Sequence, residues 1–343
     1  MSILECILID STSGEIKLTA NDMELGIETI IEGEILEKGI IALDAKIFLE
    51  IVRKLPDNDI TITTDSNFKT AITCEKAKFN IIGKSGEDFS YLPMIERNES
   101  IVLSQYTLKE VIRQTIFSIS DNDNNKLMSG ELFEINGEEM RVISLDGHRI
   151  SIRKIHLKNS YPAKKVVVPG KTLNEISKIL SGDADKDVTI FFTDKHIVFE
   201  FENTTVVSRL IEGEYFKIDQ MLSSDYETKV VIHKKELLDC IDRATLLIKE
   251  GDKKPIIINI TDNSMELKIN STVGSMDEEI DIEKMGKDLM IGFNPKFLID
   301  ALRVIDDETI TIYLVNPKAP CFIRDEENNY IYLILPVNFT TVS

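Results

Sequence analysis

Apolar and polar residues alternate with a period of two along most of the chain, as they do in strands that bury one face. Met140–Leu145 and Met265–Asn270 are typical runs, and short polar turns such as Asn136-Gly137 separate them. Runs joined by such turns predict antiparallel hairpins. Helical periodicity occurs in short stretches between the hairpins. The pattern therefore predicts an α+β fold in which antiparallel sheets carry a few helices.

One helical segment recurs three times, each time with a turn-like entry, an amphipathic helix, an acidic turn and a β-branched strand. The three copies are Ala42–Ile62, Val168–Ile190 and Gly292–Ile312. The lysines near the start of each helix follow one another at equal intervals of 125 residues: Lys46, Lys171 and Lys296. Equal spacing of matched segments indicates an internal repeat. It predicts three similar domains over residues 1–99, 100–228 and 229–343.

A second predicted helix precedes each of the last two copies. These helices cover Thr107–Ser118, where Thr107 and Glu110 form a capping-box pattern, and Lys234–Ile248. The first copy instead begins directly at the predicted strand Glu5–Asp10. About 30 residues of the repeat have no counterpart there. We therefore expect that the first strand and helix of domain one are either lost or encoded upstream of the given start.

The composition is that of a globular protein, but the net charge is unusual. Apolar residues make up 43% of the chain and charged residues 29%, which is enough for real cores. The four cysteines lie far apart and form no disulfide or metal-binding pattern. No apolar run reaches the roughly 20 residues of a membrane span. We therefore expect a cytoplasmic protein without a metal, a cofactor or a membrane contact. The net charge of −19 argues against simple adhesion to nucleic acid.

Basic residues nevertheless recur at matching places on the predicted helices. In the three repeated helices a second cation follows the first by seven residues, which returns it to nearly the same helix face. The two upstream helices each add a pair. The candidates for a phosphate-facing lining are Lys46, Arg53, Lys109, Arg113, Lys171, Lys178, Lys235, Arg243, Lys296 and Arg303. The alternative is that these residues form the solvated faces of ordinary surface helices.

Several motifs, in collinear order along the whole chain, resemble those of a known family. One of them is Ser144–Ile150, which reads Ser-Leu-Asp-Gly-His-Arg-Ile and follows a Gly-x-Leu-Phe-Glu strand. The other segments that carry the resemblance are Gly130–Glu134, Val167–Lys171, Phe89–Pro93, Asn294–Ile305 and Tyr332–Val337. Together they resemble the bacterial beta sliding clamps, which are the beta subunits of DNA polymerase III.

The resemblance implies a head-to-tail homodimer of three-domain protomers that closes into a ring. Antiparallel sheets would form the outside, and helices would line a central pore around double-stranded DNA. An acidic protein could then remain on DNA by topology rather than by affinity. The implied partners are the DNA polymerase III alpha subunit, the clamp loader and repair polymerases, which would bind through short linear motifs. No catalytic activity is implied.

The resemblance also implies a partner-peptide pocket between domains two and three. Phe216 stands where the family often has proline, Leu145 where it has threonine and Asn338 where it has arginine, which leaves the peptide preference open. Leu246 and Leu247 match apolar positions of the family's dimer interface. The pocket residues carried over to this chain are Met128, Leu145, His148, Ile150, Phe216, Met221, Leu333, Leu335, Pro336, Val337 and Asn338.

Two other functions are compatible with parts of the sequence. Asp146 and His148 could form an acid–base pair in an enzyme. The chain has four histidines and no recognised hydrolase or nucleotide-binding motif, and an Asp-Gly pair is typical of a turn. The second alternative is a clamp-like protein that binds partner peptides without encircling DNA, and the short first repeat favours this alternative.

Overall fold

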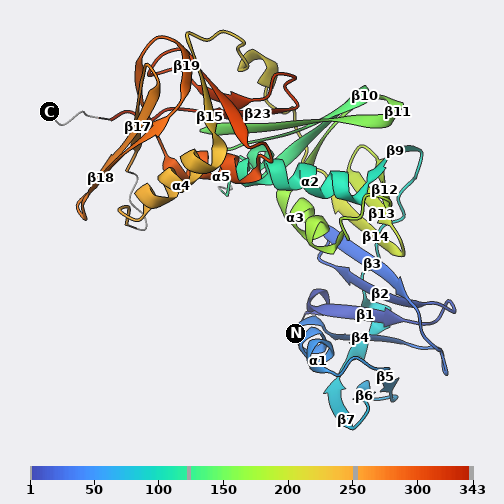
Figure 1. The fold of residues 1–343 in the computed structure, drawn as a ribbon. Coiled ribbons are helices and arrows are strands. Elements are labelled where there is room, and N and C mark those ends of the chain that lie inside the picture. The colour runs from blue at the N-terminus through green and yellow to red at the C-terminus, as the bar shows by residue number, and fades with distance from the viewer. Residues whose placement is uncertain (1, 122–124, 250–253, 340–343) are drawn as a thin grey trace. The chain divides into compact units, whose positions relative to one another are not determined.

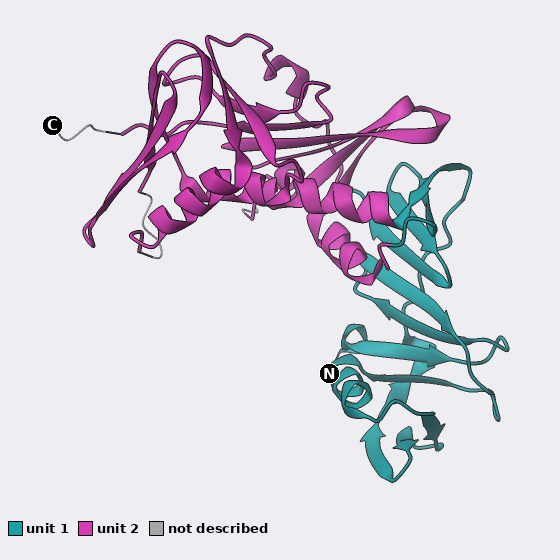
Figure 2. Cartoon of the chain, viewed as in Figure 1, with its two compact units in different colours: residues 1–105, 183–210 teal, residues 106–182, 211–343 magenta. Residues whose placement is uncertain are grey.

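The structure is a computed structural model that describes residues 2–121, 125–249 and 254–339 (Figure 1). The chain forms two compact units (Figure 2). Unit 1 contains residues 1–105 and 183–210, and unit 2 contains residues 106–182 and 211–343. The units divide the chain differently from the three predicted domains because each large sheet takes strands from two of them. The boundaries at residues 99 and 228 remain a prediction.

Unit 1 is built on a nine-stranded sheet with antiparallel pairing. Val206 of one predicted domain pairs with Ile27 of another in this sheet. A three-stranded sheet and one helix, α1 (Ala45–Lys54), complete the unit. In spatial order the nine strands are β8 (Lys84–Ser85), β4 (Ile40–Asp44), β1 (Cys6–Asp10), β2 (Ile16–Asn21), β3 (Leu25–Ile31), β14 (Thr204–Arg209), β13 (His196–Phe201), β12 (Asp187–Phe192) and β9 (Glu99–Ser104). The smaller sheet contains β5 (Thr61–Thr64), β6 (Lys69–Cys74) and β7 (Ala77–Ile82).

Unit 2 contains a seven-stranded and a four-stranded sheet, and its helices run along one side of them (Figure 2). The larger sheet has the order β10 (Gly130–Leu145), β11 (Arg149–Pro169), β23 (Tyr330–Ile334), β22 (Cys321–Arg324), β21 (Thr309–Leu314), β15 (Thr228–His233) and β19 (Glu283–Gly286). The smaller sheet has the order β18 (Ser275–Asp281), β17 (Ser264–Asn270), β16 (Ile256–Thr261) and β20 (Leu289–Phe293). The helices are α2 (Gln105–Thr115), α3 (Gly170–Ile179), α4 (Lys234–Thr245) and α5 (Pro295–Val304). Short 3-10 turns occur at Ile3–Glu5, Gly86–Asp88, Ile116–Ser118, Lys126–Ser129 and Ile218–Gln220.

The threefold repeat predicted from the sequence is confirmed. The helices α1, α3 and α5 each contain 10 residues and begin 125 residues apart, at Ala45, Gly170 and Pro295. Local chemistry fixes two of these starts, because side chains there accept hydrogen bonds from otherwise unpaired N–H groups of the first turn. Asp44 accepts from the Ile47 amide, and Asn294 accepts from the Lys296 amide.

Two boundaries of the predicted upstream helices are wrong. The helix α2 begins at Gln105 rather than at Thr107, so Thr107 lies inside the first turn and not at the N-cap position. The reason is tertiary: β9 runs straight into α2, and the Gln105 amide donates to the Lys186 carbonyl at 2.8 Å. The helix α4 ends at Thr245, and the predicted last residues, Leu246–Ile248, lie in a turn.

The strand β10 reverses direction near Gly137, which agrees with the predicted Asn136-Gly137 turn. Glu134 and Arg141 are seven residues apart on this strand, and an extended strand of that length would span about 23 Å. Their side chains nevertheless meet, with Arg141 Nε donating to Glu134 Oε2 at 2.6 Å. Gly137 has a φ of 62°, a conformation that glycine adopts without a steric penalty.

The seven-stranded sheet separates two apolar cores. Tyr332 and Ile334 of β23 belong to the core that includes residues of α4 and α5. The alternate residues Ile331 and Leu333 belong to a second core on the opposite face. The segment that follows β14 covers this second face, because Tyr215 and Ile218 pack there. This second core contains many of the predicted partner-binding residues.

A fully buried carboxyl group lies in β10. Glu131 has 0% exposure, and among the described residues neither of its oxygens has a hydrogen-bond partner. The neighbouring Thr115 hydroxyl donates instead to the Val111 carbonyl at 2.7 Å. Burial raises the pKa of Glu131 from 4.5 to about 8. The carboxyl group is therefore neutral at pH 7 in the folded protein.

We predict that Glu131→Gln stabilises the protein in a pH-dependent manner. Below pH 4.5 the carboxyl is neutral in both states, so the substitution should change little. Between pH 4.5 and about 8 the unfolded chain ionises while the folded chain stays neutral, and wild-type stability falls. The gain at pH 8 should be on the order of 4 kcal/mol. Thermal unfolding of both proteins at pH 5 and pH 8 measures this difference, with exposed Glu139→Gln as the control. A gain that is equal at both pH values would contradict the prediction.

Candidate partner-binding site and DNA-facing helices

The turn between β10 and β11 is formed by Asp146, Gly147 and His148. The Asp146 carboxylate accepts hydrogen bonds from the backbone amides of His148, at 2.9 Å, and Arg149, at 3.1 Å. Gly147 has a φ of 87°, which favours glycine. Asp146 thus shapes the turn, as the Asp-Gly pair predicts. It is already occupied by these bonds and by Arg149, so the geometry does not favour an acid–base pair with His148.

Arg149 is the buried centre of this region, with 6% exposure. Its Nε donates to Asp146 Oδ2 at 3.0 Å, its Nη1 to Asp300 Oδ2 at 2.6 Å and its Nη2 to the Phe117 carbonyl at 2.5 Å. The rings of Phe117 and Phe297 lie 5.5 and 4.5 Å from the guanidinium carbon. One side chain therefore ties the turn to α5 and to the 3-10 turn that follows α2, Ile116–Ser118. We did not predict this role, although a charged residue at the start of a buried strand is a signal for it.

The structure brings five of the predicted partner-binding residues into one apolar cluster. Leu145 pairs with Ile150, and Ile150 pairs with Leu333 across adjacent strands. All three are buried on the face away from α4 and α5, and Met128 and Phe216 pack against them. Met221 and Leu335 are more exposed, at 47% and 36%. A buried floor with exposed apolar side chains beside it is suited to an apolar peptide.

The residues after β23 form a second side of this region, which we call the C-terminal tail (residues 335–339). The Leu335 amide donates to the His148 carbonyl at 2.9 Å, and the Val337 amide donates to the Gly292 carbonyl at 2.9 Å. The His148 ring stacks on Phe297 at 6.1 Å. Pro336 and Val337 are half-buried, and Asn338 is exposed. The tail thus joins the Asp146–His148 turn to β20.

An ion-pair network holds the segment that carries Phe216 and Met221. Arg141 Nη1 donates to Asp219 Oδ1 at 2.9 Å, and this hydrogen bond is the largest cause that lowers the pKa of Asp219. Arg141 also binds Glu134, as described above. The Phe216 ring packs edge-on against Tyr215 at 5.4 Å. This side of the site is therefore fixed to β10 from outside the apolar cluster.

The cations predicted to face DNA fall into two groups. The lysines in the first helical turn are exposed in every case: Lys46, Lys171, Lys235 and Lys296. The cations further along are paired with acidic residues: Arg53 with Glu50 at 4.0 Å, Lys178 with Glu175 at 2.8 Å, Arg303 with Asp242 at 3.2 Å and Arg243 with Glu278. The exposed lysines at the helix starts are therefore the candidates for contact with phosphates.

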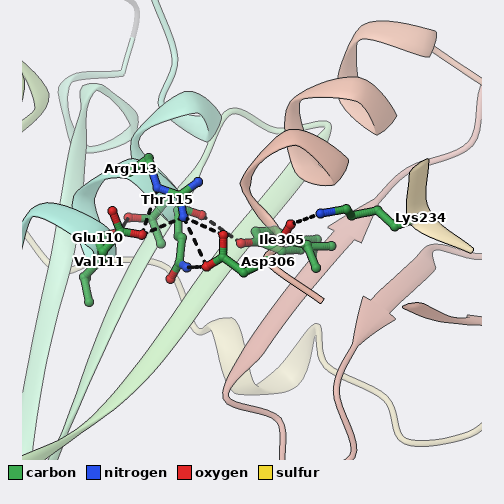
Figure 3. Close-up of polar contacts among 9 residues, drawn as sticks. Glu110, Val111, Arg113, Thr115, Lys234, Ile305 and Asp306 are labelled. Atoms are coloured by element: carbon green, nitrogen blue, oxygen red, sulfur yellow. Dashed lines mark hydrogen bonds and ion pairs between the residues drawn. The ribbon is translucent and has the colours of Figure 1, made fainter. Parts of the chain in front are cut away.

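The cations of α2 are also occupied. Figure 3 shows Arg113 between Glu110 and Asp306, and the hydrogen bond to Glu110 is the largest cause that raises the pKa of Arg113. Lys109 Nζ donates to the Leu180 carbonyl at 3.0 Å. In the same view Lys234 reaches the Ile305 carbonyl at 2.5 Å. These contacts join helices to their neighbours rather than leaving their charge available to phosphates.

The described residues hold no group of three His, Cys, Asp or Glu side chains that could bind a metal ion. None of the helices among them is long and apolar enough to span a membrane.

We predict that Arg149→Met destabilises unit 2 by about 3 kcal/mol, because it removes a buried cation and leaves the two partly buried carboxylates of Asp146 and Asp300 without their ion pair. The matched control is Arg324→Met. Arg324 also stacks on an aromatic ring, with its guanidinium carbon 4.6 Å from the Tyr313 centroid, but within the described residues it pairs with no carboxylate. Its loss should cost no more than about 1 kcal/mol. Urea unfolding of the two variants tests the difference, and equal losses would contradict the assigned role of Arg149.

Three family models match the chain in succession. They are the N-terminal, central and C-terminal domains of the DNA polymerase III beta subunit, over residues 1–93, 102–217 and 219–338. The beta sliding clamp of Staphylococcus aureus strain Mu50 is 34% identical over 348 residues, which cover 98% of this chain and 92% of that protein. The clamp of Staphylococcus epidermidis is 32% identical with the same coverage.

Solved structures are similar over the same length. A putative DNA polymerase III beta subunit from Eubacterium rectale is 78% identical with a TM-score of 0.95, covering 99% of this chain and 93% of that chain. The DNA polymerase sliding clamp of Bacillus subtilis is 32% identical with a TM-score of 0.93, covering 98% and 92%. The chain therefore belongs to the DNA polymerase III beta subunit family, the bacterial beta sliding clamps.

Proposed function

We propose that this chain is a DNA sliding clamp, of which two copies join head to tail and close around duplex DNA. The observation that carries the proposal is the match of three consecutive beta-subunit domains along the chain. The ring would tether the DNA polymerase III alpha subunit for processive synthesis and would be placed on DNA by the clamp loader. The chain is a non-catalytic processivity factor. Its proposed location is the bacterial cytoplasm, where the replicated DNA lies.

The charge distribution supports retention by encirclement. A chain of net charge −19 has little long-range attraction for a polyanion. Exposed lysines at the starts of α1, α3, α4 and α5 can nevertheless approach phosphates if the helices face the enclosed DNA. Phosphate contacts carry no sequence information. A ring with few such contacts can slide along any sequence without being held at one place.

Ring closure needs two complementary surfaces on each protomer. The strands β7 and β18 each lie at the edge of a sheet and can offer unpaired backbone groups to another chain. Lys78 lies in β7 and Lys76 immediately before it, and β18 contains Asp277, Glu278 and Glu279. Opposite charges on the two edges favour head-to-tail pairing over pairing of like edges.

The predicted interface leucines differ in exposure. Leu246 is 80% exposed, whereas Leu247 packs partly against the core of α4 and α5. Ile82 at the end of β7 is also 78% exposed. We propose that Leu246 contacts the partner subunit directly and that Leu247 mainly supports it.

The partner-binding site is proposed to lie between the second and third predicted domains, on the apolar cluster of Leu145, Ile150 and Leu333. Partner proteins, including repair polymerases, would insert the apolar residues of a short linear motif there. The support is the combination of a buried floor, two fixed sides and exposed Met221 and Leu335. Flexible methionine suits a site that accepts several peptides in turn.

We predict that the wild-type chain has a solution mass near twice 38.9 kDa at micromolar concentration, measured by light scattering. Leu246→Asp should shift the mass towards one protomer, because it introduces a charge at the proposed contact. Leu36→Asp is the matched control, since Leu36 is also 80% exposed but belongs to neither edge strand. A monomeric wild type would instead support a peptide-binding protein that does not encircle DNA.

A second prediction concerns the helix-start lysines. The double variant Lys171→Glu and Lys296→Glu should leave the fold intact but shorten the lifetime of the loaded ring on nicked circular DNA at least several-fold, through lost phosphate contacts. The control reverses two exposed lysines outside the helices, Lys195 and Lys318. Gel filtration of ring bound to DNA measures retention. Equal retention of all three proteins would show that these helices do not face DNA.

A further inference from the structure

Within the described residues, two backbone hydrogen bonds connect the C-terminal tail to the rest of unit 2. Beyond Ile334 the chain leaves the sheet, and the amides of Leu335 and Val337 donate to the carbonyls of His148 and Gly292, both at 2.9 Å. Pro336, which lies between them, has no N–H to donate. Ordering a terminal segment costs conformational entropy at each residue. Two peripheral hydrogen bonds are weak compensation for that cost, so a further contact is needed.

Gly292 provides the space for that contact. A Cβ atom built at Gly292 would lie 2.6 Å from Phe339 Cδ1, 3.3 Å from Phe339 Cε1 and 3.1 Å from the Val337 carbonyl oxygen. The missing side chain thus allows both the Phe339 ring and the tail backbone to lie directly against β20. Gly292 does not have a positive φ, so its backbone conformation is open to any residue. What this position requires is space.

The strand that contains Gly292, β20, is rigid. Gly292 pairs with Ile257 of β16, and its neighbours Ile291 and Phe293 are 0% and 2% exposed. The next residue, Asn294, caps α5, which carries Phe297 beneath His148 and Asp300 beside Arg149. Phe339 therefore fixes the tail to the same framework that positions the Asp146–His148 turn.

We propose that Phe339, seated on Gly292, is a positioning residue that holds the C-terminal tail in the arrangement that captures partner proteins. The inference rests on the proposed partner site and extends it to a residue that lies outside the predicted set. Phe339 acts through Leu335, Pro336 and Val337, and Gly292 acts by the absence of a side chain. Together, Phe339 and Gly292 determine how far the tail already has its partner-binding conformation before a partner binds.

The test measures the affinity of the full-length protein for the purified alpha subunit of DNA polymerase III from the same bacterium. Phe339→Ala should weaken binding about tenfold, and Phe339→Leu should restore part of the loss. Gly292→Ala should weaken binding to a similar degree by displacing the ring and the tail. Phe68→Ala is the control, because Phe68 is a 39% exposed phenylalanine in the turn between β5 and β6.

The double variant separates positioning from general stability. Once Phe339 is alanine, an added Cβ at Gly292 meets only the Val337 oxygen among the close contacts, at 3.1 Å. Gly292→Ala should therefore cost less affinity in the Phe339→Ala protein than in the wild type. The melting temperature and the mass of the ring should stay at wild-type values in all variants. Additive losses of affinity that follow falling melting temperatures would overturn the proposal.

Deletion of Leu335–Ser343 distinguishes failure of this inference from failure of the proposed function. If the deletion abolishes binding and Phe339→Ala does not weaken it, the tail forms part of the site but Phe339 does not position it. If the deletion protein binds the alpha subunit like the wild type, the partner site itself is misplaced and the inference fails with it.

Discussion

The buried guanidinium of Arg149 is the constraint on which the partner-binding region depends. Removing a cation from water is costly unless its donors are paired, and here it faces two carboxylates, a carbonyl and two aromatic rings. These groups come from the turn after β10, from α5 and from the 3-10 turn that follows α2. If either carboxylate shifted alone, the buried guanidinium would lose part of its pairing. This arrangement also positions His148, which is part of the turn, and the tail, because the Leu335 amide donates to the His148 carbonyl.

The chain is acidic as a whole, but its positive charges are distributed unevenly along each helix. Acidic neighbours neutralise most cations in the later helical turns, whereas the lysines of the first turns are exposed. Such a distribution keeps the protein soluble and weakly adhesive, and it confines the positive charge to a few repeated points. Contact with DNA then depends on geometry rather than on overall attraction. This is the property that a mobile tether requires.

The sequence predicted the repeated part of the structure well, because residues close to one another in the sequence determine its helices and turns. The helices α1, α3 and α5 have the predicted spacing, and Asp44 and Asn294 cap two of them. The α+β class and the Asp146-Gly147 turn follow from alternation and turn residues. The predicted start of α2 was wrong because the hydrogen bond from the Gln105 amide to the Lys186 carbonyl overrides the capping pattern at Thr107. The roles of Arg149, Arg141 and Gly292 depend on partners far along the chain. No local pattern identifies those partners. Among the acidic partners of the predicted cations, Glu50, Glu110 and Glu175 lie three residues before their cations, whereas the partners of Arg243 and Arg303 are distant in the sequence.

The pairing of β3 with β14 has a consequence for how the molecule acquires its structure. The hydroxyls of Thr29 and Thr204 meet at 2.9 Å although 175 residues separate them. During synthesis the edge of β3 must wait unpaired while that intervening chain emerges. Closing such a long loop is slow, and an open edge is prone to pair with other chains. Assembly of the nine-stranded sheet should therefore limit the folding rate of the whole chain and make its early stages sensitive to crowding by newly made copies.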